Sequence, residues 1–250
     1  MTVLRLYALD FDGVLCDSAI ETGVTGWKVA RQIWRDMPEH VPDDMIALFR
    51  DVRPVMETGY EAILIMRLLF EGVEADILLN NFAAMIEKTI AKYKLQISNL
   101  KQQFGDTRDN WIASSMAQWI DMNPLFKGVA EKLRSLNVND CMIITTKQER
   151  FVSQILAAND VDFPADQIFG LDRKMSKQDV LYQLLEKDTE QVILFVEDRL
   201  PTLHAVLADT RLKQVSCLFA GWGYNTQQDK ADANNIAKIK TLKLHDFIAL

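Results

Sequence analysis

Residues 4–14 read Leu-Arg-Leu-Tyr-Ala-Leu-Asp-Phe-Asp-Gly-Val, and this stretch decides the fold class. Its first six residues form a short, largely apolar run, which is typical of a buried strand. The run ends in Asp10 and Asp12, which a fully extended chain would point to opposite faces. Gly13 permits a turn, and a turn at this point can bring both carboxylates toward one pocket. The alternative interpretation is an ordinary turn that closes a strand.

Three later segments repeat the apolar strand pattern: residues 141–145, 192–196 and 215–219. Apolar residues at helical spacing occur between them, at residues 129–136, 149–158 and 177–187. Strands that alternate with helices predict an α/β fold with a doubly wound, Rossmann-like parallel sheet.

The interval between the first two strands is far too long for a single crossover connection. Most of it carries apolar residues near a 3.6-residue period, at residues 22–37, 42–49, 59–70, 75–95 and 109–122. We therefore expect residues 1–16 and 124–250 to form the α/β core. Residues 17–123 are expected to form an inserted, all-helical cap domain.

Polar side chains follow the predicted strands at their carboxyl ends, which is where open α/β sheets bind ligands. They are Asp10 and Asp12, Thr145 and Thr146, and Glu197 and Asp198. A carboxylate can attack phosphorus and form an acyl phosphate, while a second carboxylate protonates the leaving oxygen and then activates water. Clustered carboxylates repel one another unless a cation lies among them, and hard oxygen ligands suit Mg²⁺. The alternatives are a solvated turn at Glu197-Asp198 and ordinary strand-end residues at Thr145 and, more so, at Thr146.

A lysine is also needed, because negative charge develops on a phosphoryl group during transfer. Lys177, at the start of the helix before the third strand, and Lys174, three residues earlier, are the candidates, with an ordinary surface lysine as the alternative for each. Lys147 is closer in sequence to Thr145, but we expect it to face solvent.

The charge and cysteine content of the chain limit the partners and the cellular location that we expect for it. The formal net charge of −7 disfavours nucleic acid, which requires a basic surface. The three cysteines are widely spaced and show neither zinc spacing nor a disulfide framework, so we expect a cytoplasmic protein. The amino-terminal stretch lacks a signal-peptide pattern, and no apolar segment is long enough to span a membrane.

The pattern resembles the haloacid dehalogenase superfamily of phosphohydrolases, and its phosphoglycolate phosphatase-like members in particular. Four short segments carry the resemblance: residues 10–14 with Leu15, Asp17 and Ser18; Ile143-Ile144-Thr145; Lys177-Gln178-Asp179-Val180-Leu181; and Glu197-Asp198. Residues 123–128 resemble the turn that re-enters the core, residues 220–224 resemble the glycine-rich loop after a later strand, and the helical insert occupies the position of a C1-type cap. In the commoner form of the fourth motif a second aspartate follows four residues later, where this chain has Thr202.

The resemblance implies a phosphatase that acts on a small phosphorylated metabolite through an aspartyl-phosphate on Asp10, with Asp12 as the general acid/base. It implies phosphate binding by Thr145 (with Thr146) and Lys177 (or Lys174), and Mg²⁺ on Asp10, the Asp12 carbonyl and Asp198, with Glu197 as a further candidate ligand. Dehalogenases lack an acid at the position of Asp12, so phosphoryl transfer is favoured.

The cap is expected to choose the leaving group. Arg53, Lys28 and Arg31 are candidates for an anionic part of the substrate, with a solvated helix face as the alternative for each. A phosphomutase or phosphonate hydrolase of the same superfamily and a non-catalytic binding protein on this scaffold are the alternative functions. The chain is expected to act as a monomer or homodimer.

Overall fold

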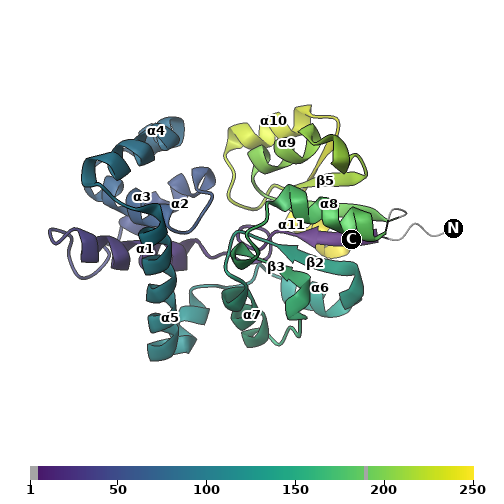
Figure 1. The fold of residues 1–250 in the computed structure, drawn as a ribbon, viewed down its shortest axis with the longest axis horizontal. Helices are drawn as coiled ribbons and strands as arrows, with labels where there is room; N and C mark the ends of the chain where they lie inside the picture. Colours follow the sequence, from purple (N-terminus) through teal and green to yellow (C-terminus); the bar gives the residue numbers. More distant parts are fainter. Residues whose placement is uncertain (1–4, 189–190) are drawn as a thin grey trace. The chain divides into compact units, whose positions relative to one another are not determined.

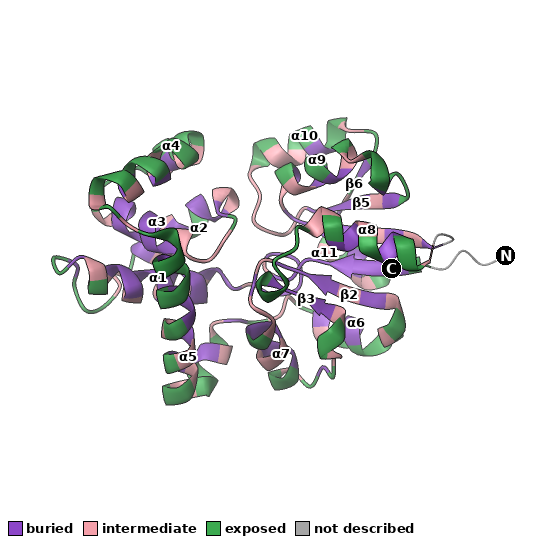
Figure 2. Ribbon diagram, in the orientation of Figure 1, coloured by how far each residue is buried: buried purple, intermediate pink, exposed green. Residues whose placement is uncertain are grey.

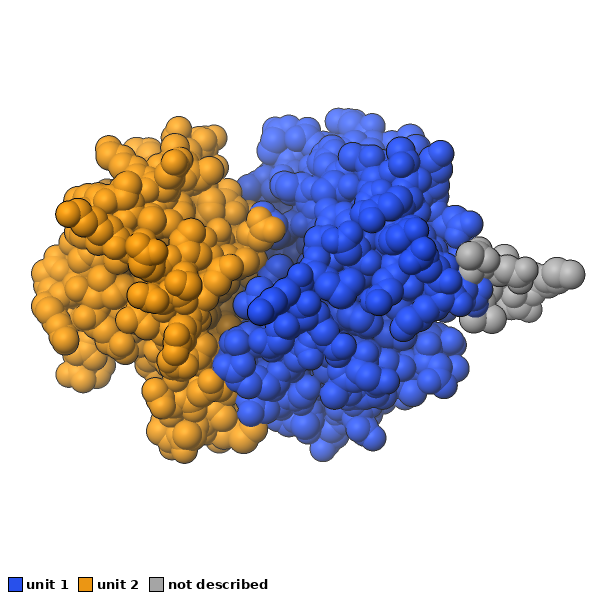
Figure 3. All heavy atoms as spheres, in the orientation of Figure 1, with its two compact units in different colours: residues 1–17, 125–250 blue, residues 18–124 orange. Residues whose placement is uncertain are grey.

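The computed structural model describes residues 5–188 and 191–250. The chain divides into two compact units, shown in Figure 3. Unit 1 comprises Met1–Asp17 and Leu125–Leu250, and unit 2 comprises Ser18–Pro124. Among the described residues, no helix is long and apolar enough to cross a bilayer.

Unit 1 is built on a parallel sheet flanked by helices (Figure 1). The sheet has six strands in the order β3-β2-β1-β4-β5-β6. The strands are β1 (Arg5–Leu9), β2 (Cys141–Ile144), β3 (Ile168–Phe169), β4 (Val192–Glu197), β5 (Val215–Ala220) and β6 (Ile239–Leu242). The predicted α/β fold with a doubly wound parallel sheet is confirmed. The first strand was predicted to begin at Leu4, which lies outside the described residues.

Helices cover both faces of this sheet. They are α6 (Val129–Ser135), α7 (Glu149–Ala158), α8 (Lys177–Lys187), α9 (Leu200–Ala208), α10 (Gln227–Asn235) and α11 (Leu244–Ala249), with short 3₁₀ turns η2 (Val138–Asp140), η3 (Ala165–Gln167), η4 (Leu171–Arg173) and η5 (Thr210–Leu212). Leu6 and Ala8 face a core shared with α8, α9 and α10. Tyr7, between them on β1, points to the other face, where its hydroxyl donates to the carbonyl of Leu250 just after α11. The strands are accordingly buried while the outer helix faces are exposed (Figure 2).

The order of the strands creates a switch point at the centre of the sheet. From β1 the chain runs outward through β2 and β3 on one side, and through β4, β5 and β6 on the other. In register, Leu9 of β1 lies opposite Ile143 of β2 and Val196 of β4. The residues that follow these three positions therefore meet at one edge, where ligands bind in open α/β sheets.

Unit 2 is helical throughout. It consists of α1 (Ala19–Ile33), α2 (Met45–Val52), the 3₁₀ turn η1 (Arg53–Val55), α3 (Glu61–Phe70), α4 (Ala75–Tyr93) and α5 (Ile97–Asp121). Helix α5 begins twelve residues before the predicted residue 109. Its first half is largely polar and buries only a few side chains, among them Leu100 and Phe104, so its helical period is weak in the sequence. The backbone of α5 is interrupted at Ser115, where φ is −160° and ψ is 78°.

Candidate active site

The loop after β1 folds back tightly on itself. The carbonyl of Phe11 accepts hydrogen bonds from the amides of Leu15 and Cys16, both at 2.9 Å. Gly13 has a φ of +86°, a conformation that L-residues adopt only with strain. A Cβ at this position would also collide with the carboxylate of Asp198 and come within 2.8 Å of the Tyr224 ring. Glycine is therefore required here for both backbone and packing reasons, as the sequence predicted for the turn.

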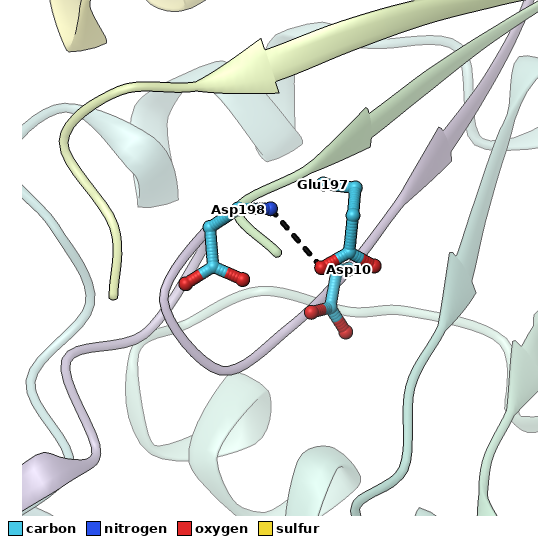
Figure 4. Close-up of side chains that lie close together, drawn as sticks. All are labelled: Asp10, Glu197 and Asp198. Carbon is cyan, nitrogen blue, oxygen red and sulfur yellow. Dashed lines mark hydrogen bonds between the residues drawn. The ribbon is translucent and has the colours of Figure 1, made fainter. Parts of the chain in front are cut away.

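At the end of β4, Glu197 and Asp198 lie beside Asp10 (Figure 4). All three side chains are buried, and each offers a carboxylate oxygen within 4.8 Å of the others. Asp10 is tied to β4 through its amide, which donates to the carbonyl of Val196 at 2.9 Å. The two strands thus bring together residues that are almost 190 positions apart in the sequence.

Lys177, the first residue of α8, reaches this cluster. Its Nζ lies 2.9 Å from Asp10 Oδ1 and 2.7 Å from Glu197 Oε2. The other Glu197 oxygen, Oε1, accepts the amides of Asp198 and Arg199 at 3.1 and 2.9 Å. Both oxygens of Glu197 are therefore engaged by protein donors, and one of them holds the lysine next to Asp10.

The ionisation of this cluster shows a shortage of positive charge. Burial, and then the nearby Glu197 carboxylate, raise the pKa of Asp10 to about 7, although Lys177 acts in the opposite direction. Burial disfavours the charged form of Glu197 too, but the Lys177 ammonium and main-chain donors hold its pKa below the ordinary value. One ammonium thus stabilises one buried carboxylate well and the second one only in part.

The end of β2 supplies a second lysine, and here the sequence-based expectation is wrong. Lys147 was expected to face solvent, yet its side chain is fully buried and its Nζ donates to Asp12 Oδ1 at 3.0 Å. The turn after β2 aims it inward: Thr145 Oγ1 accepts the amide of Lys147 at 3.1 Å, and the Lys147 carbonyl accepts the amide of Leu171. The sequence carried one signal: Lys147 follows a predicted strand, at the same edge of the sheet as Asp10 and Asp12, whose carboxylates need positive counter-charges.

The glycine-rich loop after β5 contacts both the β1 loop and Asp198. The amide of Tyr224 donates to Asp198 Oδ2 at 2.6 Å, and its hydroxyl donates to Asp17 Oδ1 at 2.9 Å. The indole of Trp222 donates to the carbonyl of Val14 at 3.1 Å. Gly223 lies between them, and a Cβ there would collide with the carbonyl of Gly13 and with Asp198. The sequence indicated this loop but not the contacts that it makes.

The acidic cluster fits a hard divalent cation. Together with Asp12, its carboxylates (Asp10, Glu197 and Asp198) outnumber the ammonium groups of Lys147 and Lys177 that contact them. Burial and, after it, the charge of Glu197 raise the pKa of Asp10. Carboxylate oxygens are the ligands that Mg²⁺ prefers, and a cation between Asp10 and Asp198 would remove the excess charge.

Comparisons with known proteins find solved structures that share this fold. No protein-family model and no curated protein sequence matches the chain. Among solved structures, a predicted phosphoglycolate phosphatase from Haemophilus somnus superposes with a TM-score of 0.60 at 18% identity, covering 100% of this chain and 98% of that one. A haloacid dehalogenase-like family hydrolase from Streptococcus pneumoniae superposes with a TM-score of 0.56 at 20% identity, covering 100% and 99%. The chain has the fold of the haloacid dehalogenase-like hydrolases.

The resemblance found in the sequence is therefore confirmed at the level of the fold. The same haloacid dehalogenase-like fold also occurs in Protein Tyrosine Kinase A from Mycobacterium tuberculosis, with a TM-score of 0.52 at 19% identity and coverage of 100% of both chains. Proteins with different named activities thus share this architecture, so the argument for function has to come from the site itself.

The remaining predicted site residues lie in different surroundings. Thr145 is buried at the end of β2, whereas Thr146 is half-buried. Lys174 lies on an exposed turn after η4 with a φ of +55°, so of the two candidate lysines only Lys177 reaches the acidic cluster. Arg53 belongs to unit 2, where it is buried and its Nη1 donates to the carbonyl of Met56 at 3.2 Å.

Proposed function

We propose that the chain is a Mg²⁺-dependent phosphatase that hydrolyses a small phosphorylated metabolite through an aspartyl-phosphate on Asp10. One observation carries the proposal: Asp10 and Asp12, two residues apart at the switch point, each contact a different lysine, Lys177 and Lys147. Two carboxylates in distinct electrostatic surroundings can take different roles in one reaction, which is the requirement for a nucleophile and an acid/base.

In the first step an Asp10 carboxylate oxygen attacks phosphorus, and the bond from phosphorus to the leaving oxygen breaks. Asp12 gives its proton to that oxygen, so the leaving group departs as a neutral alcohol. In the second step Asp12, now ionised, takes a proton from water, and the water oxygen attacks the phosphorus of the aspartyl-phosphate. The bond between phosphorus and the Asp10 oxygen breaks, inorganic phosphate leaves, and both residues return to their starting states.

Other residues hold the phosphoryl group. Thr145, whose oxygen already accepts the amide of Lys147, keeps its hydroxyl proton to donate to a phosphoryl oxygen. Lys177 already lies against Asp10 and can stabilise charge on the transferring group without a large movement. Thr146 is a second-choice donor on the same turn.

Asp10, Asp198 and the main-chain carbonyl of Asp12 are the proposed ligands of Mg²⁺. When bound, the ion would supply positive charge to the phosphoryl oxygens as a Lewis acid. We assign Glu197 to positioning Lys177 rather than to the metal, because both of its oxygens accept hydrogen bonds from the protein.

A mutase and a phosphonate hydrolase use related chemistry, and each predicts a different product. A mutase would interconvert phosphorylated isomers without a net release of phosphate. A phosphonate hydrolase that forms an imine with its substrate would be inactivated by borohydride in the presence of that substrate. A non-catalytic binding protein would turn over none of these compounds.

The test is hydrolysis of an aryl phosphate and of a panel of phosphorylated metabolites, with and without Mg²⁺. We expect turnover that chelator abolishes, and no activity in Asp10→Asn. Asp166→Asn is the matched control, because Asp166 is exposed on unit 1 and should tolerate the same change. If the folded wild-type protein hydrolyses nothing on the panel, the phosphatase proposal fails.

The wider setting of the protein follows from the same proposal. A small phosphorylated substrate fits a protein with a net charge of −7 only where lysines and a metal reverse the local field. We propose a cytoplasmic enzyme that binds neither nucleic acid nor membranes and acts as a monomer or homodimer. Its three cysteines are all buried and form no disulfide, which is compatible with a reducing compartment.

A further inference from the structure

A second site of interest lies entirely within unit 2, in a groove lined by α1 and α5. Figure 1 shows these two helices crossing. The groove encloses about 330 Å³. Its lining residues are Lys28, Arg31 and Gln32 from α1, and Thr107, Asn110, Trp111 and Ser114 from α5. The spacings of three and four residues place each set on one face of its helix.

A buried ion pair fixes the two helices against each other beside this groove. Arg108 of α5 donates from Nε and Nη2 to the two carboxylate oxygens of Glu21 on α1, at 2.8 and 2.6 Å. Thr25 and the indole of Trp119 donate to the same carboxylate. Lys28 lies seven residues after Glu21 on the same face of α1, and Trp111 lies three residues after Arg108. The walls of the groove are therefore held in place before any ligand binds, which lowers the entropy lost on binding.

The groove presents positive charge without an acid among its lining residues. Lys28 Nζ lies 3.2 Å from the centre of the Trp111 ring, and no described carboxylate forms an ion pair with it. The charge of Glu21 acts to raise the pKa of Lys28, but Glu21 is itself ion-paired with Arg108. Arg31 is half-buried, and among the described residues its one ion pair is a long contact to Glu39, at 3.9 Å. Burial lowers the pKa of Lys28, and an anion in the groove would offset that effect.

Uncharged donors complete the site. Thr107 offers a hydroxyl, and Asn110 and Gln32 offer amides, whereas the hydroxyl of Ser114 already donates to the carbonyl of Trp111 at 2.9 Å. Gln32, Asn110 and Ser114 are exposed, so the groove is open to solvent. Polar groups that converge in a groove fix the orientation of a ligand, and Trp111 supplies an apolar surface beside them.

We propose that this groove binds a small organic anion through a carboxylate or phosphate group held by Lys28 and Arg31. Its volume lies near the lower end of the range for small-molecule sites, which favours a ligand of a few carbon atoms over a nucleotide. Such an anion could be the non-reacting part of the proposed substrate or a separate effector, and the same chemistry would recognise both.

The binding test follows the indole N–H resonance of Trp111, assigned from its absence in Trp111→Phe. The full-length protein is titrated with citrate and with inorganic phosphate at constant ionic strength, and sodium chloride serves as the screening control. We expect a saturable shift with at least one of the two anions, weakened by about tenfold or more in the double variant Lys28→Gln/Arg31→Gln. Lys88→Gln is the matched control, because Lys88 is an exposed lysine on α4 outside the groove.

A shift absent with both anions, reproduced by sodium chloride, or unchanged in the double variant overturns the proposal. This measurement needs no catalysis, so its outcome is independent of whether the chain is a phosphatase. A second experiment measures the kinetics of hydrolysis and therefore rests on the proposed function. It distinguishes an anion that is part of the substrate from one that is a separate effector. A rise in KM with unchanged kcat in Lys28→Gln assigns the groove to the substrate, whereas unchanged KM and kcat with lost citrate binding assign it to an effector.

Discussion

Replacing Lys147 by methionine removes the ammonium group that contacts Asp12 while keeping most of the side chain's apolar volume. The lysine side chain is fully buried, and that of Asp12 is 17% exposed, so water can replace the lost partner only in part. A hydrogen bond to a charged group contributes about 1.5–3 kcal/mol, and we expect a loss in the free energy of unfolding within that range. A completely buried pair would lose more, because its remaining charge would have no solvent at all.

The same substitution should slow catalysis, since the ammonium fixes the position of the Asp12 carboxylate. We expect kcat/KM to fall by about 10–100-fold, which corresponds to roughly 1.4–2.7 kcal/mol of transition-state stabilisation. Urea unfolding followed by circular dichroism measures the first effect, and initial rates on the best ester of the panel measure the second. Lys174→Met is the matched control and should change stability by less than about 0.5 kcal/mol, because Lys174 is exposed on a turn nearby in the same unit.

A double-mutant cycle with Asp12→Asn isolates the pairwise energy. The reasoning predicts a coupling energy above about 1 kcal/mol between the two positions. A coupling near zero, or a stability loss in Lys147→Met no larger than that in Lys174→Met, would refute the claim that this lysine holds Asp12.

Three further changes test other parts of the molecule. Gly223→Ala should weaken Mg²⁺ binding by about tenfold or more, measured by calorimetry, because the added methyl would displace Asp198. Unaltered metal affinity in a folded variant would contradict that role. Arg108→Met should lower the free energy of unfolding by about 3–5 kcal/mol in urea, because it leaves the fully buried Glu21 without its cation; a loss under about 1 kcal/mol would count against it. Iodoacetamide at pH 8 should not modify the native protein, as judged by mass spectrometry, but should modify it in urea. The reason is that the cysteines of the native protein are buried, and burial raises the pKa of two of these thiols, Cys141 to about 12 and Cys217 to about 11.

The features that the sequence revealed are those set by local pattern. A run of apolar residues that ends in Asp10 and Asp12 needs no distant partner to indicate a strand and its polar end. The short strand β3 and the polar strand β6 were missed, because two residues carry no periodicity and Ile-Lys-Thr-Leu has a polar centre. Those elements become strands through pairing with β2 and β5, which is a tertiary effect.

The candidate active site, too, combines features set by local sequence with features set by tertiary contacts. The burial of Lys147 depends on Asp12, which lies 135 residues away, and apart from its position after a predicted strand nothing in the sequence marks it as different from a surface lysine. The hydroxyl of Tyr224 meets Asp17 across 207 residues. Local pattern therefore located the strand ends where chemistry can occur, whereas the partners that orient each group came only from the folded chain.

Glu197 and Asp198 illustrate how the fold gives neighbouring residues of one type different tasks. In the sequence they are an acidic pair, and either could be a metal ligand. In the sheet, the last residue of β4 directs its carboxylate to Lys177 and to the amides that follow the strand. The next residue has left the strand, and its carboxylate turns to the amide of Tyr224 at the close approach of Gly13. Exchanging the two acids would therefore preserve the charge of the cluster but direct a carboxylate of the wrong length to each partner, because the site distinguishes them by the donors that each one meets.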